Sequence, residues 1–142
     1  MALNIIKLCV GCSTLEELES FIAFQLSQQK DSLKAERIHT TRMVPKRIEE
    51  ILDGGSLYWV IKGNIQCRQT FLDIRPFTDR DGIQRCEFVL DPKVIPTHWQ
   101  SRRAFQGWRY LTVNDAPKDD VMGANKKLPP HLRRELAELG LL

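Results

Sequence analysis

The stretch GGSLYWVIKG, residues 54–63, constrains the fold more than any other part of this sequence. Its middle is apolar, aromatic and β-branched on both alternating faces, which is typical of a strand buried on both sides. The two glycines end the preceding element, and Gly63-Asn64 predicts a tight reversal, because both residues tolerate the positive φ that hairpin turns require. A buried strand that reverses at once pairs antiparallel with the strand that follows.

The next two segments continue this hairpin pattern. Residues 65–77 alternate imperfectly in polarity, which predicts a strand with a bulge or a switch of faces in its middle. The segment TDRDG, residues 78–82, has the composition of a turn, and residues 83–90 predict the answering strand. Cys86, Phe88 and Leu90 share one side of that strand and are expected on the core face.

The flanking segments predict helices and further strands. Ser13 and Glu16 have the capping-box spacing that starts a helix, and Pro45 suits the first position of a second, shorter helix. In chain order we expect a strand over 3–10, a helix over 13–29, a strand over 37–43, a helix over 45–53, a Pro-punctuated loop over 91–103, a strand over 104–113, a mobile surface segment over 114–128 and a C-terminal helix over 129–140.

Together these elements predict an α+β fold, with a mostly antiparallel curved sheet or a small open β-barrel and two or three flanking helices. The chain shows no linker or repeat and is expected to form a single domain, 1–142. No apolar run approaches the roughly 20 residues of a membrane span, and the N-terminus lacks the features of a signal peptide. We therefore expect a cytoplasmic protein without a membrane partner, whose four cysteines are reduced.

Sequence motifs for catalysis are weak. Cys9 and Cys12 lie between a predicted strand and a predicted helix, where a thiol–disulfide oxidoreductase places its nucleophile. However, the antiparallel hairpins do not supply the βαβ partner of that fold, and the cysteines and histidines show no paired zinc spacing. Small buried thiols are favoured over redox or metal chemistry, and no metal or cofactor is predicted. Whether the protein is an enzyme stays open, with non-catalytic binding favoured.

Positive charge and aromatic rings concentrate in two segments. Residues 39–47, HTTRMVPKR, and residues 97–110, THWQSRRAFQGWRY, contain six lysines and arginines and no acid. Lysine and arginine bind backbone phosphates, whereas flat rings and guanidinium planes stack on unpaired bases. The alternative is a solvated basic face whose aromatic residues belong to the core.

Several stretches resemble a known family. IKLCVG, TTRMVPKR, GGSLYWVIKG, RQTFLDIRPF and FQGWRYL together resemble a bacterial family of uncharacterised proteins, domain of unknown function family 1489, over nearly the whole chain. This resemblance implies a single-domain, cytoplasmic protein and carries no activity. The order of strands, helices and glycine turns is also similar to the PUA and ASCH-type pseudobarrels, which generally bind RNA or modified bases, although this second likeness is one of pattern alone.

Two functional hypotheses follow. The first is an RNA-binding module without catalysis. The second is an enzyme or small-molecule binder in which arginines hold a phosphate or carboxylate, and a scaffold that binds proteins through exposed tryptophans is a third hypothesis. We expect the N-terminus of the 45–53 helix and the 102–109 segment to line one cleft, where unpaired backbone N–H groups attract an anion. The candidate binding residues are Thr41, Arg42, Lys46, Arg47, Lys62, Trp99, Arg102, Arg103, Trp108 and Arg109.

Overall fold

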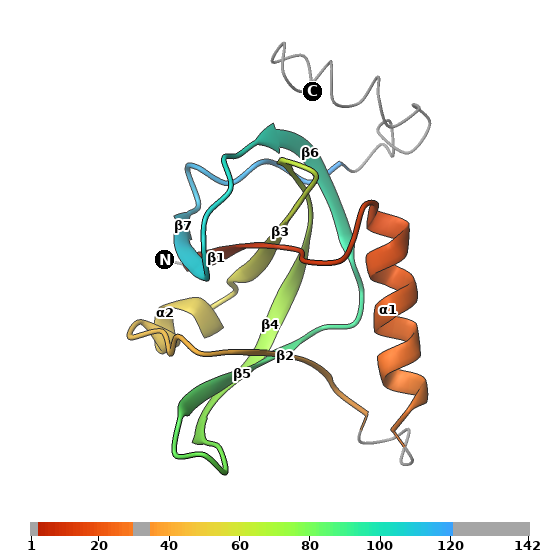
Figure 1. Cartoon of the computed structure of the whole chain (residues 1–142). Coiled ribbons are helices and arrows are strands. Elements are labelled where there is room, and N and C mark those ends of the chain that lie inside the picture. The colour runs from red at the N-terminus through yellow and green to blue at the C-terminus, as the bar shows by residue number, and fades with distance from the viewer. Residues whose placement is uncertain (1–2, 30–34, 121–142) are drawn as a thin grey trace.

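The computed structural model describes residues 3–29 and 35–120, which form one mixed sheet flanked by two helices (Figure 1). In chain order the elements are β1 (Leu3–Leu8), α1 (Leu15–Ser27), β2 (Arg37–Thr41), α2 (Ile48–Leu52), β3 (Ser56–Ile61), β4 (Asn64–Thr78), β5 (Gln84–Leu90), β6 (Ile95–Ser101) and β7 (Trp108–Thr112). The predicted helix over 129–140 lies outside the described residues.

The sheet is open and mostly antiparallel. Its strand order is β2-β5-β4-β3-β1-β7, and β6 pairs with β4 beside this path. β1 and β3 are parallel, whereas the other pairs of named strands in the described residues are antiparallel. The predicted α+β class with an open sheet is confirmed, and no ladder joins β2 to β1 or β7 within the described part of the chain.

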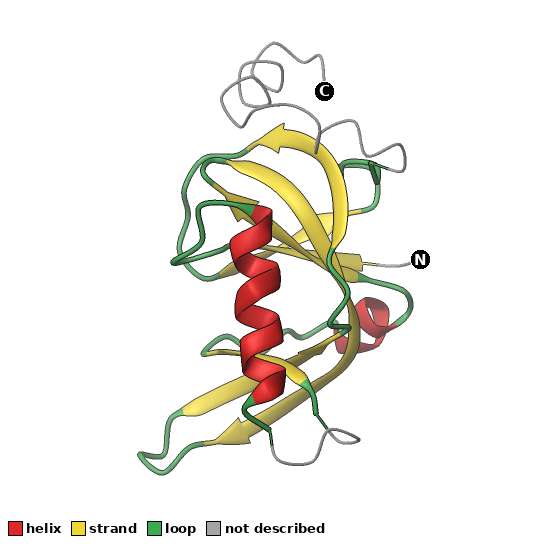
Figure 2. Cartoon of the chain, turned by 90° about the vertical axis from the view of Figure 1, so that its right-hand side faces the viewer, coloured by secondary structure: helices red, strands yellow, loops and turns green. Residues whose placement is uncertain are grey.

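β4 is the strand that bends the sheet. Its 15 residues pair first with β3 and β6 and then with β5. The register shifts between Phe71 and Asp73, which is the bulge that the imperfect alternation predicted. Across the bend, Phe88 of β5 packs in the same core cluster as Trp59 of β3, and Figure 2 shows α1 along one side of the sheet.

The core occupies both faces of β3. On one face, Trp59 packs in a cluster with Phe88 of β5 and Leu18 of α1, so this cluster joins both ends of the bent sheet. On the other face, Tyr58 and Val60 pack in a second cluster. The prediction that residues 54–63 contain a strand buried on both sides is therefore confirmed.

The start of each helix differs from its prediction. The Thr14 hydroxyl accepts a hydrogen bond from the Glu17 backbone N–H at 3.1 Å and caps α1, one residue later than the predicted pair Ser13 and Glu16. α2 begins at Ile48 rather than at Pro45, and it ends at Leu52.

Two predictions about turns and loops were wrong. Lys62 and Gly63, with φ of 51° and 80°, form the centre of the β3–β4 turn, one residue before the predicted Gly63-Asn64. Residues 95–101 of the predicted loop form β6, which contains Pro96. Proline is tolerated at the periphery of a sheet, where its missing N–H leaves no central ladder bond unmade.

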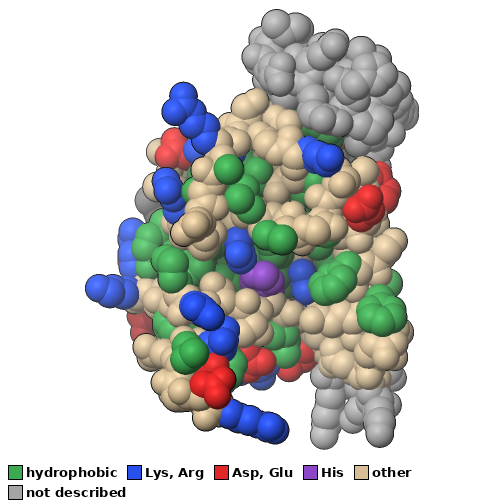
Figure 3. All heavy atoms as spheres, viewed as in Figure 1, with side chains coloured by type: hydrophobic (Ala, Val, Ile, Leu, Met, Phe, Trp, Pro, Cys, Tyr) green, Lys and Arg blue, Asp and Glu red, His purple; other side chains and the backbone are tan. Residues whose placement is uncertain are grey.

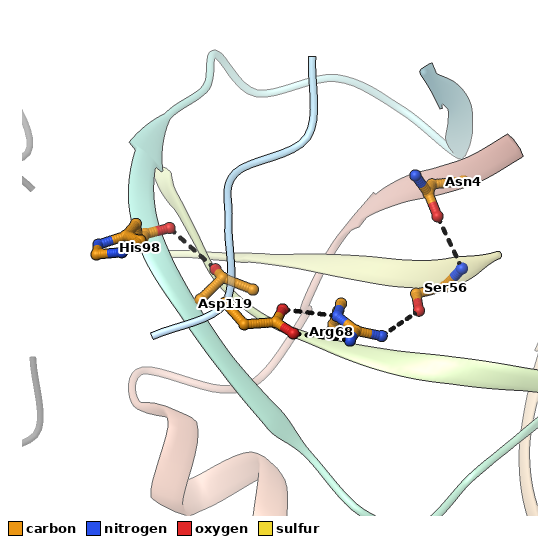
Figure 4. Close-up of polar contacts among 6 residues, drawn as sticks. Asn4, Ser56, Arg68, His98 and Asp119 are labelled. Atoms are coloured by element: carbon orange, nitrogen blue, oxygen red, sulfur yellow. Dashed lines mark hydrogen bonds and ion pairs between the residues drawn. The ribbon is translucent and has the colours of Figure 1, made fainter. Parts of the chain in front are cut away.

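The segment that follows β7 lies against β6 and β4. The backbone N–H of His98 donates to the Lys118 carbonyl at 2.8 Å. The Arg68 guanidinium binds both carboxylate oxygens of Asp119 at 2.8 and 2.9 Å, and it donates to the Ser56 hydroxyl at 2.7 Å (Figure 4). Residues 114–120, which begin the segment predicted to be mobile, are held by these bonds, whereas residues 121–128 lie outside the described residues. No helix in the described ranges is long and apolar enough to cross a membrane.

Candidate ligand-binding pocket

A cavity of about 520 Å³ lies between β1 and β2, in the gap that the open sheet leaves. The pairing of β7 with β1 ends at Lys7, opposite Trp108, so the β1 edge beyond Lys7 has no paired strand on that side. The volume is within the range of small-molecule sites in proteins. We call this cavity the seam pocket; its walls are residues 7–12, Glu17, Leu18 and Phe21 of α1, Arg37 and His39 of β2, and Trp59 of β3.

Arg37 is a buried cation in the wall of this pocket. It is 3% exposed, and its Nη1 donates to two neutral oxygens, the Gln25 Oε1 at 3.0 Å and the Ile38 carbonyl at 3.3 Å. Its Nε is buried without a hydrogen-bond partner. The guanidinium carbon lies 5.5 Å from the Phe21 ring centroid and 5.9 Å from that of Trp59. Burial lowers the Arg37 pKa, yet an arginine remains charged in proteins, so the pocket holds a positive charge that no described acid neutralises.

Lys7 adds a second cation to the same pocket. It is half-buried at the end of β1, and this burial lowers its pKa. The acid in the lining, Glu17, turns its carboxylate to the backbone N–H of Ser13 at 2.9 Å. The balance of charge in the lining is therefore positive.

His39 and Trp59 form an aromatic part of the wall. Their ring centroids are 5.2 Å apart and the planes are nearly perpendicular. Burial, together with the charges of Lys7 and Arg37, lowers the pKa of His39 to about 4, so the imidazole is neutral at neutral pH. The Trp59 indole is fixed because its Nε1 donates to the Gln69 Oε1 at 2.9 Å. A ligand would therefore meet a rigid, uncharged ring surface beside the two cations.

The two cysteines of the Cys9-Cys12 pair border the pocket on the β1–α1 loop. Both are free thiols that are half-buried, so the small buried thiols predicted at this pair are only partly covered, whereas Cys67 and Cys86 are buried. Burial and the hydrogen bond with Cys12 raise the pKa of Cys9, which keeps this thiol protonated at neutral pH. Among the described residues, no cluster of three or more histidines, cysteines and acids is arranged to hold a metal ion.

Figure 3, drawn in the view of Figure 1, shows this face of the molecule from outside. A histidine lies near the middle of the face, with basic and hydrophobic side chains around it, between the strands labelled β1 and β2 in Figure 1. The face between β1 and β2 therefore presents a mixture of basic and hydrophobic side chains to solvent.

The candidate binding residues Trp99 and Trp108 belong to the core. Trp99 and Trp108 are 6% and 5% exposed, so neither presents an open ring face. The Trp108 indole N–H donates to the Met43 carbonyl at 2.8 Å, and its ring packs edge-on against Phe88. Trp59 is also buried, so none of the three tryptophans shows the exposed ring that the scaffold hypothesis expected.

The predicted anion site at the start of the second helix is occupied by a side chain. The Tyr110 hydroxyl accepts hydrogen bonds from the backbone N–H groups of Lys46 at 3.0 Å and Arg47 at 3.4 Å. The Arg47 side chain forms an ion pair with Glu50. The backbone N–H groups of Lys46 and Arg47, two of the donors expected to bind an anion, are therefore already used. The same bonds place residues 46–47 beside β7, so the helix start and β7 are neighbours.

A second cavity, of about 580 Å³, gathers several of the predicted residues. Its lining includes Arg102, Arg103, Phe105, Arg109 and Tyr110, and we call it the arginine cavity. Lys62 lies in the adjacent turn, because the Arg102 backbone N–H donates to the Gly63 carbonyl at 2.8 Å. Ile6 borders the arginine cavity and Lys7 borders the seam pocket. Successive side chains of a strand point to opposite faces, so the two cavities lie on opposite sides of β1.

Thr41 and Arg42 border neither cavity. Thr41 is buried at the end of β2, where it pairs with Cys86, and Arg42 is exposed just beyond it. The predicted site residues are thus divided between the core, the arginine cavity and the start of α2.

A comparison with models of known protein families identifies the family of this chain. A family model described as a protein of unknown function, DUF1489, matches residues 5–142. The chain belongs to the DUF1489 family. No curated protein and no solved structure matches it. The resemblance to PUA and ASCH-type pseudobarrels is therefore not confirmed, and the function of this DUF1489 protein has to be inferred from its geometry.

Sequence reasoning missed Arg37 and His39, although a signal was present. Residues 37, 39 and 41 alternate along β2 and so share one face. Arg37 and Thr41 are buried, which shows that this face points inward. A strand that turns polar residues inward has to satisfy them with protein groups, water or a ligand. The polar composition of this strand was therefore the available signal for the seam pocket of this DUF1489 chain.

Proposed function

We propose that this DUF1489 protein binds a small organic anion in the seam pocket. The observation that carries the proposal is Arg37, a residue that is 3% exposed, borders a cavity of ligand size and has no described acid to neutralise its charge. A carboxylate or phosphate in the pocket supplies the missing counter-charge, and the planar guanidinium binds either group through paired N–H donors. Lys7 provides a second positive charge on the same wall.

The rest of the lining favours a ligand with a planar or apolar body. Phe21 is 51% exposed and lies under the Arg37 guanidinium, and Trp59 forms a rigid ring surface deeper in the pocket. His39 is neutral and Cys9 is protonated at neutral pH, so neither adds charge that would repel such a body. The ligand class is therefore an anion attached to a ring or a short apolar chain.

RNA binding is the second candidate function. The burial of Trp99 and Trp108 removes the stacking residues that the sequence suggested. The arginine cavity nevertheless keeps Arg102, Arg103 and Arg109 together, and this observation supports a nucleic-acid surface separate from the seam pocket.

The test of anion binding is a titration of ¹⁵N-labelled protein, followed through its backbone amide signals, with three probes: sodium phosphate, benzoate and adenosine 5′-monophosphate. We expect saturable shifts at residues 7–12 and 37–39, with benzoate or the nucleotide binding more tightly than phosphate. Lys7→Gln is expected to weaken binding about tenfold, the effect of one charge-assisted hydrogen bond. Arg37→Lys keeps the charge, loses the planar donors and is expected to weaken binding as well.

The matched control is Arg75→Gln on β4, which removes a charge outside the pocket lining. This variant is expected to bind the probes as the wild type does. Equal losses in Lys7→Gln and Arg75→Gln would show a general charge effect, and the absence of saturable shifts at residues 7–12 and 37–39 with all three probes would overturn the proposal.

A further inference from the structure

A second binding surface, independent of the seam pocket, runs along the edge strand β7. We propose that it binds single-stranded nucleic acid, with arginines on the phosphates and exposed rings against the bases. We call it the β7 surface; it consists of Lys62, Arg102, Arg103, Phe105, Arg109 and Tyr110. It shares no residue with the seam pocket and lies on the other side of β1, so the two proposals stand or fall separately.

Arg102 is held in place by neutral groups. Its Nε and Nη2 donate to the Gln100 Oε1 at 3.0 and 2.7 Å, and Nη2 also reaches the Asp115 carbonyl at 3.4 Å. Because these partners carry no charge, the guanidinium is ordered without being neutralised. An ordered cation loses less side-chain entropy when it binds a phosphate.

Arg109 and Phe105 form a second recognition element. The Arg109 guanidinium carbon lies 5.1 Å from the Phe105 ring centroid, and Arg109 is exposed. Guanidinium and ring planes of this kind stack on unpaired bases, which is how proteins hold single strands with little sequence preference. The acid in this lining, Asp115, accepts a hydrogen bond from the Thr112 hydroxyl at 3.0 Å.

Past the cavity, the surface reaches Lys46 at the start of α2, where Arg47 is already paired with Glu50. Tyr110 borders the arginine cavity, and its hydroxyl binds the backbone N–H groups of Lys46 and Arg47. The Arg47 guanidinium carbon lies 5.7 Å from the Tyr110 ring centroid. In Figure 3, basic side chains gather along the left margin, where Figure 1 places β7 and α2.

This extended arrangement distinguishes a polymer from a small anion. Cations at both ends of β7 fit a chain of evenly spaced phosphates, whereas one small ligand would leave most of them unused. The partly exposed ring of Phe105, beside the Arg109 guanidinium, adds a site for a base that an anionic lipid headgroup would not need. Single-stranded nucleic acid is therefore the partner that the described groups match best.

The test is fluorescence anisotropy of the full chain with a labelled twelve-nucleotide uridine RNA, the matching thymidine DNA and an RNA duplex. We expect micromolar binding of one or both single strands. If about four phosphates are contacted, affinity falls roughly 50-fold when salt rises from about 50 to about 200 mM. Tighter binding of the uridine RNA would identify RNA as the partner, and equal binding would show that the surface does not distinguish RNA from DNA. Either result supports the proposal that the β7 surface binds single strands.

Arg103→Gln and Arg109→Gln are each expected to weaken binding about three- to tenfold and to reduce the salt slope by about 0.7. The control is Arg80→Gln, which removes an exposed charge from the β4–β5 turn and is expected to leave affinity unchanged. Equal effects of Arg80→Gln and Arg109→Gln would overturn the assignment, as would duplex binding as tight as single-strand binding. Binding of phosphatidylserine vesicles without binding of either single strand would identify a lipid surface instead.

The experiment also separates this proposal from the seam pocket. Lys7→Gln is expected to leave nucleic-acid affinity unchanged, and Arg109→Gln is expected to leave the benzoate and nucleotide shifts at residues 7–12 unchanged. A loss of both activities in either variant would show that the two surfaces are one site and would overturn the inference of a separate β7 surface.

Discussion

Replacing Gly55 with alanine is expected to destabilise this fold strongly, because the added Cβ would meet main-chain atoms. An ideal Cβ at this position lies 2.2 Å from the Leu3 carbonyl oxygen and 2.4 Å from the Ile51 carbonyl oxygen, whereas real Cβ contacts stay beyond 3.0 Å. These oxygens belong to β1 and α2. Relief therefore requires a shift of whole elements in a close-packed interior, and rotation of a side chain does not suffice.

The magnitude follows from two opposing terms. Overpacking of a core typically costs about 1–3 kcal/mol, and a clash with fixed backbone falls at the upper end of that range. Alanine has less conformational freedom than glycine in the unfolded chain, and this difference stabilises the folded state by only about 0.4–1 kcal/mol. We expect the free energy of unfolding to fall by about 2 kcal/mol or more, which lowers the Tm of a domain of this length by roughly 6–10 °C.

The assay is thermal and urea unfolding followed by circular dichroism, with Gly82→Ala as the matched control. Gly82 has a φ of 79°, but its Cβ would meet no atom within 4 Å, so this variant tests the backbone conformation without the clash. The left-handed conformation costs an alanine about 1–2 kcal/mol. A Gly55→Ala protein as stable as wild type, or more stable than Gly82→Ala, would refute the reasoning that β1 and α2 fix this position.

Three further predictions concern the core, an ion pair and the thiols. Phe88→Ala is expected to lower the free energy of unfolding by about 3–5 kcal/mol in urea titrations, because the ring is fully buried between both ends of the sheet; a loss below about 1 kcal/mol would contradict this packing. The hydrogen bonds from Arg68 lower the pKa of Asp119, so the stability that they add is present above the unfolded pKa and is lost as pH falls through the folded pKa. In unfolding measurements from about pH 5 to pH 2, the wild type should therefore lose more stability than Asp119→Asn. Parallel stability profiles of the two proteins would exclude this linkage. When native protein is treated with iodoacetamide, Cys9 should be alkylated before Cys67, because Cys67 is fully buried. Peptide mass spectrometry follows the order of alkylation, and the reverse order would contradict the described burial.

Patterns of short range predicted the centre of the sheet correctly. The alternation in 54–63 placed Trp59 and Tyr58 on opposite buried faces of one strand, and the spacing of Cys86, Phe88 and Leu90 identified the core face of β5. The break in alternation of 65–77 located the bulge of β4. Each of these features depends on neighbouring side chains and on a turn between adjacent strands, so the local sequence contains the information.

The sites were harder to predict because distant segments create them. β1 pairs in parallel with β3 and antiparallel with β7, and neither pairing has a local sequence signal. The basic segment 97–110 was read as one surface, yet its alternating side chains divide it. Trp108 points into the core, whereas Arg109 points to the arginine cavity, and a strand assignment alone does not say which side is covered.

The seam pocket exists because of where β7 begins. β1 pairs with β3 along one edge and with β7 along the other. Where both edges of β1 are paired, β2 cannot pair with it. Gly107 has a φ of 69°, outside the range of an extended strand, and the pairing of β7 with β1 starts at the next residue, opposite Lys7. Beyond Lys7 the seam pocket lies between β1 and β2, and Arg37 of β2 is part of its wall. One left-handed glycine therefore sets where the β1 edge is left open, with the seam pocket on one side of β1 and the arginine cavity on the other.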